Sequence, residues 1–188
     1  MKQLDLYLQN ERIKKIKPFI RDISLVLDIG CFDGELFKQI ESQLQFGYGI
    51  DPLLEKAVKT KKYWLMPGKF PEDLPKDIGS FDTITALAVF EHVTPEDQGS
   101  FAESCWQYLK PGGRVIVTVP SNFVDKILDV LLRVGLVDGM SVEQHHNFNP
   151  TITPSIFMQA GFEVEYSGKF QLGLNNLFVF KRSKLNNN

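Results

Sequence analysis

The chain has 188 residues, of which 43% are hydrophobic and 12% aromatic, so it can form one domain with a sizeable core and is not globally disordered. Its formal net charge of −2 at pH 7 offers no electrostatic footprint for nucleic acid, and no apolar run approaches the roughly 20 residues of a membrane span. The polar N-terminal stretch lacks the apolar core of a signal peptide, and the two cysteines lack metal-ligand spacing, so we expect a cytoplasmic protein with reduced thiols.

Residues 1–22 are expected to form an N-terminal helical segment that Pro18 breaks or kinks. Beyond it, short apolar runs predict strands and amphipathic stretches predict helices. The predicted strands cover residues 25–29, 46–51, 62–66, 81–87, 114–119, 162–168 and 172–181. The predicted helices cover about 34–44, 53–60, 95–109 and 153–160, with Thr94 as the N-cap of the third.

The alternation of strands and helices predicts an α/β fold with a parallel sheet and right-handed crossovers. The last two strands follow each other across a short loop, which is typical of an antiparallel hairpin at the end of an otherwise parallel sheet. We find no internal repeat and no linker, so residues 1–188 are expected to form a single domain.

The run LVLDIGCFDG at residues 25–34 is the most informative about function. It reads as a buried strand that ends in Asp28, a tight loop bearing Gly30 and Gly34, and the start of a helix. Glycine lets a backbone approach a ligand closely, and a helix N-terminus offers unpaired N–H groups. In a parallel α/β sheet, ligands bind at the carboxyl ends of the strands, where this loop must lie.

A second acid, Asp51, ends the next strand, 17 positions after Gly34. A carboxylate at this place can accept hydrogen bonds from both ribose hydroxyls of a nucleoside. The pattern G-x-G-x-x-G is absent, and Asp28 and Asp33 would serve a pyrophosphate poorly. The loop therefore suits a nucleoside with a cationic or zwitterionic group better than a dinucleotide.

These segments resemble the class I S-adenosylmethionine-dependent methyltransferases. The matching segments, in the family's order, are LDIGCFDG at 27–34, GYGIDP at 47–52, FDTITALAVFEHV at 81–93, LKPGGRVIVTVP at 109–120 and QAGFEVE at 159–165. Within the class, the chain is most similar to the small-molecule group that includes the quinone-biosynthesis methyltransferases. The resemblance implies a Rossmann-like three-layer sandwich, with a mostly parallel seven-stranded sheet of order 3-2-1-4-5-7-6 in which strand seven is antiparallel.

The resemblance also implies S-adenosylmethionine as cofactor and S-adenosylhomocysteine as product. The cofactor-binding residues that it implies are Asp28, Gly30, Cys31, Phe32, Gly34, Asp51, Pro52, Phe70, Ala86 and Leu87. Two positions depart from the family pattern: Phe32 stands where glycine is commonest, and Lys69 stands where an acid accepts from the adenine amino group. The adenine contact would then pass to a backbone carbonyl or to Phe70.

Several of these residues also have a structural interpretation. Asp28 can cap the end of its strand, and Asp51 can be the N-cap of a helix opened by Pro52. Phe70 is as readily explained by packing as by contact with the base. Phe32 must turn its ring away from the cofactor or crowd it.

Three histidines are candidates for the catalytic base, because imidazole accepts a proton near neutral pH. His92 follows the fourth predicted strand, where shaping the loop is the alternative role. His145 and His146 lie in an insertion at 121–150, which is expected to hang over the acceptor site as a lid. Within it, an apolar helix at 123–134 would pack on the sheet, form a dimer surface or line an apolar substrate pocket. No second acid stands at the strand end to hold a divalent ion, so no metal is expected.

The sequence thus predicts transfer of a methyl group, by in-line displacement, to a small-molecule acceptor. The apolar helix of the insertion is compatible with an apolar acceptor. A base is needed only if the acceptor must lose a proton. The alternative is a methyltransferase-like binding protein without turnover, which Phe32 and Lys69 favour. A nicotinamide-dependent oxidoreductase is disfavoured by the broken glycine pattern and the closing hairpin. The expected partner is the small-molecule acceptor, with no nucleic acid and no membrane span, and the chain is expected to be a monomer or a homodimer.

Overall fold

In the computed structural model, residues 3–121 and 148–183 are described. The helices among them are α1 (Gln3–Ile16), α2 (Glu35–Gln39), α3 (Gln98–Tyr108) and α5 (Thr153–Gln159). The strands are β1 (Ser24–Ile29), β2 (Leu44–Asp51), β3 (Val58–Lys59), β4 (Tyr63–Pro67), β5 (Phe81–Leu87), β6 (Leu109–Pro120), β7 (Glu163–Phe170) and β8 (Asn175–Lys181). Short 3₁₀ turns lie at Lys17–Phe19, Glu41–Gln43, Phe90–His92, Pro150–Ile152 and Gln171–Gly173.

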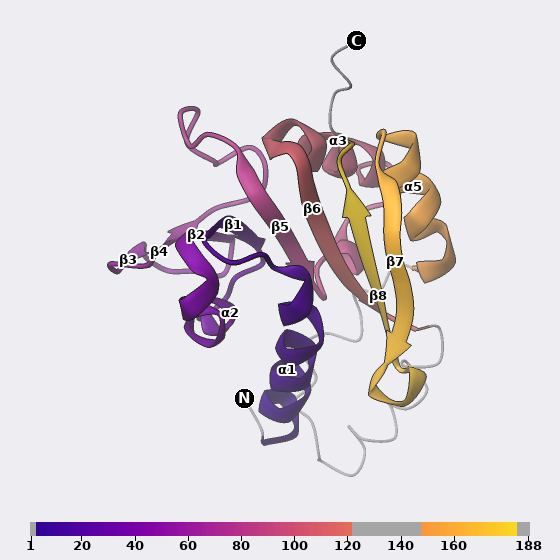
Figure 1. Cartoon of the computed structure of the whole chain (residues 1–188), viewed down its shortest axis with the longest axis horizontal. Coiled ribbons are helices and arrows are strands. Elements are labelled where there is room, and N and C mark those ends of the chain that lie inside the picture. Colours follow the sequence, from indigo (N-terminus) through magenta and orange to yellow (C-terminus); the bar gives the residue numbers. More distant parts are fainter. Residues whose placement is uncertain (1–2, 122–147, 184–188) are drawn as a thin grey trace.

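All eight strands belong to one sheet of order β3-β4-β2-β1-β5-β6-β8-β7 (Figure 1). The five central strands β4, β2, β1, β5 and β6 run parallel, whereas β8 is antiparallel to both β6 and β7. With β3 set aside, this is the order 3-2-1-4-5-7-6 that the family resemblance implies. The predicted α/β class and sheet topology are therefore confirmed, and β3 is an additional edge strand.

The predicted helix at about 53–60 is wrong. The segment after Asp51 forms turns and then β3, which pairs antiparallel with β4. The connecting turn is held by Thr60, whose Oγ1 accepts from the backbone N–H groups of Lys62 and Tyr63 at 3.1 and 2.9 Å. Pairing with β4 supplies hydrogen-bond partners for the backbone of this short segment. An isolated helix of the same length would not be stable.

Other boundaries differ more modestly. The N-terminal helix α1 ends at Ile16, and Pro18 stands in the 3₁₀ turn that follows, as the break at that proline predicts. Helix α3 begins at Gln98, so Thr94 is not its N-cap. Instead the Thr94 hydroxyl donates to Asp97 Oδ2 at 2.8 Å within the turn that precedes the helix. Strand β6 begins at Leu109, five residues earlier than predicted, with an irregular register against β5.

Helices cover both faces of the sheet, so three layers form around two apolar clusters. Helices α3 and α5 pack on one face, where Phe157 of α5 stacks on Phe180 of β8 with ring centroids 4.3 Å apart. Helices α1 and α2 pack on the other face through Ile13, Ile16 and Phe37. Across residues 3–121 and 148–183 we find no helix with the length and apolar character needed to span a bilayer.

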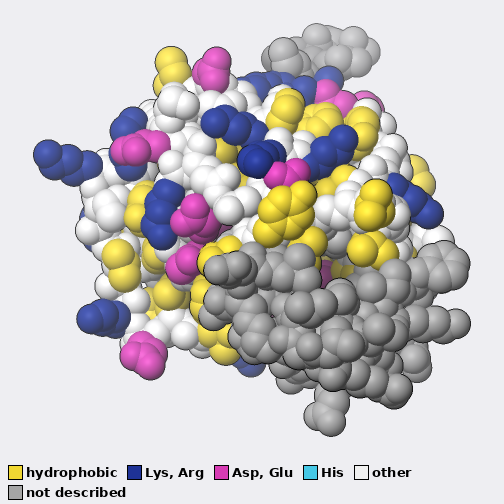
Figure 2. Space-filling view, turned by 90° about the horizontal axis from the view of Figure 1, so that it is seen from below, with side chains coloured by type: hydrophobic (Ala, Val, Ile, Leu, Met, Phe, Trp, Pro, Cys, Tyr) yellow, Lys and Arg dark blue, Asp and Glu magenta, His cyan; other side chains and the backbone are white. Residues whose placement is uncertain are grey.

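The carboxyl ends of the parallel strands lie at the lower edge of the sheet in Figure 1, beside α1. Figure 2 looks onto this edge, where hydrophobic and charged side chains are interspersed on the part not drawn in grey. The predicted insertion at 121–150 would join this edge through β6. Its helix at 123–134 and both of its histidines, His145 and His146, lie outside the described residues.

Candidate functional site

The loop between β1 and α2 is built on left-handed backbone. Gly30, Phe32 and Gly34 have φ angles of 75°, 42° and 72°. A Cβ on Gly30 would lie 2.4 Å from Cγ2 of Val89, so this glycine is required by both its conformation and its contact. Phe32 adopts a conformation that costs an ordinary residue about 1–2 kcal/mol. The loop is thus a strained, closely packed turn at the carboxyl edge of the sheet.

Asp51 ends β2 and holds this loop in place. Its Oδ2 accepts from the backbone N–H of Phe32 at 2.9 Å, and its Oδ1 accepts from that of Leu53 at 2.8 Å. The bond to Leu53 closes a turn rather than capping a helix, because no helix follows. Asp51 is only 5% exposed. An ionised carboxylate offers about four acceptor sites, so two remain for hydroxyl donors of a ligand.

Asp28 lies on the neighbouring strand β1, on the sheet face that α1 covers. Its Oδ1 accepts a hydrogen bond of 2.6 Å from the hydroxyl of Thr85, the residue that pairs with Asp28 on the neighbouring strand β5. Burial raises the pKa of Asp28 to about 7, and the charges of Asp51 and Asp33 add to this effect, whereas the Thr85 bond opposes it. Asp28 therefore titrates near neutral pH and serves partly as a strand-end hydrogen-bonding group.

Cys31 and Phe32 turn in opposite directions from the loop. Cys31 is buried against β2, where a Cβ on Gly49 would lie 2.6 Å from its Sγ. Burial raises the pKa of this thiol, so Cys31 offers a ligand only its backbone. Phe32 is 43% exposed, which places its ring at the surface. Pro52, which the resemblance also implies as a cofactor-binding residue, follows Asp51 and is exposed.

Phe70 lies in the loop after β4 and packs into the core. Its ring meets those of Phe101 and Tyr108 of α3 at centroid distances of 5.3 and 6.0 Å, and the residue is half-buried. These contacts are the packing role expected as one alternative for Phe70. Contact of its ring with the adenine base stays a prediction. Lys69 is exposed, and its backbone N–H donates to Asp73 Oδ2 at 2.8 Å. Asp73 is therefore the acid that folds onto this loop.

The end of β5 forms the other wall of the site. Ala86 is fully buried and Leu87 half-buried, and both precede Ala88, whose φ angle is 58°. The Ala88 N–H donates to the carbonyl oxygen and the hydroxyl of Thr118 on β6, at 3.0 and 3.1 Å. Two strained non-glycine residues, Phe32 and Ala88, thus lie at the carboxyl edge, a placement typical of functional sites.

Sequence reasoning singled out His92 and passed over the residue before it. His92 is exposed, whereas Glu91 is buried at 3% exposure in the same 3₁₀ turn. Burial raises the pKa of Glu91 to about 7, against the charge of Arg12 on α1. In turn, burial lowers the pKa of Arg12, and the Glu91 charge opposes this. The helix α1 therefore brings a cation to the strand-end site.

This pair lies in a polar cluster that is incompletely hydrogen-bonded. Within the described residues, Gln9 Oε1, Arg12 Nε and Glu91 Oε2 are buried without a hydrogen-bond partner. Buried polar atoms are almost always paired, so this cluster at the carboxyl edge is a candidate place for a polar ligand. The only sequence signal was an arginine beside the apolar positions Ile13 and Ile16 of α1, which does not by itself distinguish a site residue from a surface one.

Comparison with known proteins agrees with this geometry. A family model described as a methyltransferase domain matches residues 4–167. The chain is 29% identical over 155 residues to the ubiquinone biosynthesis O-methyltransferase of Pseudomonas aeruginosa strain LESB58, an alignment that covers 74% of this chain and 65% of the relative. It is 28% identical over 177 residues to the protein of that name from Pseudomonas entomophila strain L48, covering 86% of this chain and 72% of the relative. The chain thus spans about 65% of the length of the first of these relatives.

Solved structures share the fold. One is the 1,6-didemethyltoxoflavin-N1-methyltransferase of Burkholderia thailandensis with bound 1,6-didemethyltoxoflavin and S-adenosylhomocysteine, which superposes with a TM-score of 0.67 at 14% identity and covers 96% of this chain and 82% of that one. Because the family model covers well over half of the chain, the chain belongs to the methyltransferase domain family, and the resemblance to the class I S-adenosylmethionine-dependent methyltransferases is confirmed.

Proposed function

We propose that the chain transfers the methyl group of S-adenosylmethionine to a small-molecule acceptor. The observation that carries this proposal is the Asp51 carboxylate, which holds the Gly30–Gly34 loop and keeps acceptor sites for the two hydroxyls of a ribose. The names of the curated relatives favour an oxygen atom as the acceptor.

The described residues fit this cofactor at both of its polar ends. Asp51 would hold the ribose, and the glycine-built loop would let the nucleoside approach the backbone. The Arg12 guanidinium, with Nε lacking a partner among the described residues, would bind the carboxylate of the amino-acid end. Asp28 and Glu91 would face its ammonium group, since both are buried acids at the same strand ends.

The bound cofactor supplies a methyl group already activated on a sulfonium, so the protein needs mainly to orient and desolvate the reactants. The rigid β5 end at Ala86 and Leu87 would fix the direction of attack, because Thr118 anchors the backbone just beyond it. Proton removal is required only for acceptors such as a phenol. His92, His145 and His146 stay the candidates for this step, two of them in the segment outside the described residues.

Calorimetry on the full chain with S-adenosylmethionine and S-adenosylhomocysteine tests the cofactor part of the proposal. We expect a dissociation constant in the range of about 1–100 μM, equivalent to roughly 5–8 kcal/mol. Asp51→Ala should weaken this binding by about 1.5–3 kcal/mol, whereas Asp77→Ala, in an exposed loop, should leave it unchanged. Absence of cofactor binding by the unaltered chain would overturn the proposal.

Turnover separates an enzyme from a binding protein. Catechol and phenol are suitable oxygen-acceptor probes, with release of S-adenosylhomocysteine measured by mass spectrometry. The alternative function, binding without turnover, is favoured by one observation: the exposed Phe32 ring where the family has glycine. Micromolar cofactor binding without methyl transfer to any oxygen, nitrogen or carbon acceptor in a broad panel would support that alternative.

A further inference from the structure

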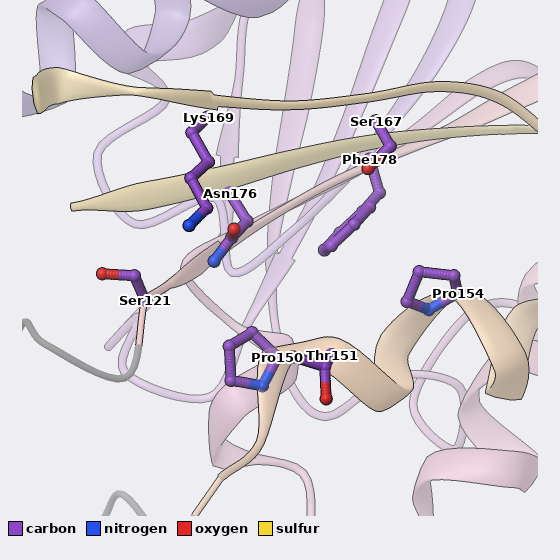
Figure 3. Close-up of a pocket in the computed structure, with 8 residues that line it drawn as sticks. All are labelled: Ser121, Pro150, Thr151, Pro154, Ser167, Lys169, Asn176 and Phe178. Carbon is purple, nitrogen blue, oxygen red and sulfur yellow. The ribbon is translucent and has the colours of Figure 1, made fainter. Parts of the chain in front are cut away.

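A cavity of about 310 Å³ opens beside the end of β6, on the sheet face that α5 covers (Figure 3). Its lining residues come from the position after β6, the 3₁₀ turn at Pro150–Ile152, the start of α5, and strands β7 and β8: Ser121, Pro150, Thr151, Pro154, Ser167, Lys169, Asn176 and Phe178. The volume is at the lower end of the range for small-molecule sites, which suits a ligand about the size of one ring.

The floor of this cavity is formed by two cross-strand pairs of the β7–β8 hairpin. Lys169 lies opposite Asn176, and Ser167 lies opposite Phe178. Residues two apart on a strand share a face, so these four side chains form one compact surface. Phe178 supplies its buried apolar part, and Lys169 and Ser167 are exposed toward solvent. The floor is therefore apolar at one end and cationic at the other.

Opposite the floor, Pro150 of the preceding 3₁₀ turn and Pro154 of α5 present rigid apolar rings (Figure 3). The end nearest β6 is polar: Asn176 Nδ2 donates to the Pro120 carbonyl at 3.3 Å, which fixes the amide. Ser121 is 6% exposed, and its Oγ has no hydrogen-bond partner among the described residues. A buried hydroxyl without a partner is unusual and is satisfied when a polar ligand group reaches it.

Among the described residues that line this cavity, Lys169 is the one charged side chain. Within the described part of the chain it forms no ion pair. The nearby acid of β7, Glu165, is engaged instead by Arg114 at 2.5 Å. An unpaired ammonium group beside apolar walls favours a ligand that carries an anionic oxygen group on an apolar body.

The cavity also lies at the correct edge of the sheet. In register, Pro120 of β6 pairs with Asn175 of β8, so the Lys169–Asn176 pair is next to the carboxyl end of β6. This is the edge at which ligands of parallel α/β sheets bind. Asp28 and Thr85 lie on the opposite face toward the same edge, so a cofactor and a second ligand would both be bound at the carboxyl edge of the sheet.

We propose that this cavity is the subsite for the anionic end of the acceptor, with Lys169 as the residue that selects a carboxylate or phosphate group. The assignment to the acceptor rests on the proposed function, whereas anion binding by the cavity does not. Lys169 acts in this proposal on specificity and affinity; it takes no part in methyl transfer itself.

The test uses benzoate as the carboxylate probe, phenyl phosphate as the phosphate probe and benzamide as the neutral control. Binding to the full chain is followed by NMR titration, with the amides of Ser167, Lys169 and Asn176 reporting the location. Lys169→Met should raise the dissociation constant of the anionic probe about tenfold, equivalent to about 1.4 kcal/mol. Lys169→Arg should stay close to the unaltered chain, and Lys76→Met, at an exposed loop lysine, is the matched control.

The relative affinities of benzoate and phenyl phosphate assign the group that the subsite takes. The proposal is overturned if neither probe binds, if Lys169→Met binds both as the unaltered chain does, or if the shifted amides lie elsewhere. It is equally overturned if saturating S-adenosylmethionine displaces the probe, because the cavity would then belong to the cofactor. Failure of the chain to bind S-adenosylmethionine would remove the proposed function alone and leave the anion-binding result standing.

Discussion

The carboxylate of Asp51 accepts a hydrogen bond of 2.9 Å from the backbone N–H of Phe32, a residue with a φ angle of 42°. One acid at the end of β2 thereby holds the strained centre of the loop that follows β1. The same carboxylate is the candidate anchor for the ribose, so loop geometry and cofactor binding would both depend on one side chain.

Replacement of Asp51 tests this dependence. Asp51→Ala should weaken S-adenosylmethionine binding by about 1.5–3 kcal/mol, the range for hydrogen bonds to a charged group, as measured by calorimetry. Asp51→Asn should fall between, because its amide keeps one acceptor oxygen. Unchanged affinity in the alanine variant would exclude Asp51 from the cofactor site.

Phe32→Gly tests whether the ring obstructs the site. Glycine accepts the left-handed backbone without strain, and the Phe32 ring is exposed, so we expect cofactor affinity to change by less than about tenfold, roughly 1.4 kcal/mol. A gain much larger than tenfold would mean that the native loop is blocked and would favour binding without turnover. Gly30→Ala provides the contrast, since its Cβ would overlap Val89 and should reduce both stability and affinity.

The raised pKa of Asp28 predicts a pH dependence of stability. In the folded chain Asp28 keeps its proton up to about pH 7, whereas its ordinary value is 3.8. The folded state thus binds more protons between these values, so stability falls as pH rises from about 4 to 7, by at most about 1.4 kcal/mol per pH unit for one group. Asp28→Asn keeps the acceptor for Thr85 and should reduce the loss of unfolding free energy between pH 5 and pH 8, measured with urea. The prediction fails if Asp28→Asn loses as much unfolding free energy between pH 5 and pH 8 as the exposed-site control Asp77→Asn, because Asp28 would then not have a raised pKa.

Arg12 provides a test of the polar cluster beneath α1. Arg12→Met should lower S-adenosylmethionine affinity about tenfold, or 1.4 kcal/mol, because a guanidinium with a buried Nε is removed from the proposed carboxylate contact. Lys14→Met, on the exposed side of the same helix, should have no effect. If both variants bind the cofactor equally well, Arg12 has only a structural role beside Glu91.

The histidines remain to be distinguished by kinetics. Alanine replacements of His92, His145 and His146 should leave cofactor affinity nearly unchanged, because none lies in the sequence segments proposed to hold the nucleoside. If the acceptor must lose a proton, one of them should lower turnover by ~10²–10⁴-fold, the usual effect of losing a general base. Full activity of the triple variant on a phenolic acceptor would show that no histidine acts as the base.

The sequence by itself determined the parts of this protein that depend on local pattern. The segment FDTITAL at 81–87 predicted β5 at its observed bounds, and its buried Phe81, Ile84 and Ala86 suit a central strand of a parallel sheet. The loop bearing Gly30 and Gly34 was equally readable, because glycine tolerates the left-handed backbone of a tight turn between a strand and a helix. Asp51 was recognised from its place at a strand end, before any contact was known.

The tertiary structure decided what depends on residues far apart in the chain. The segment after Asp51 was predicted as a helix and forms β3 because β4 supplies its hydrogen-bond partners. Arg12 and Glu91 are 79 positions apart, and only the packing of α1 across the strand ends brings their charges together. Lys169 likewise gained meaning from its pairing with Asn176 and the cavity that α5 closes over them. The local sequence pattern reflects interactions between residues that are close in the chain. Burial and charge pairing arise only when distant segments pack together and exclude water.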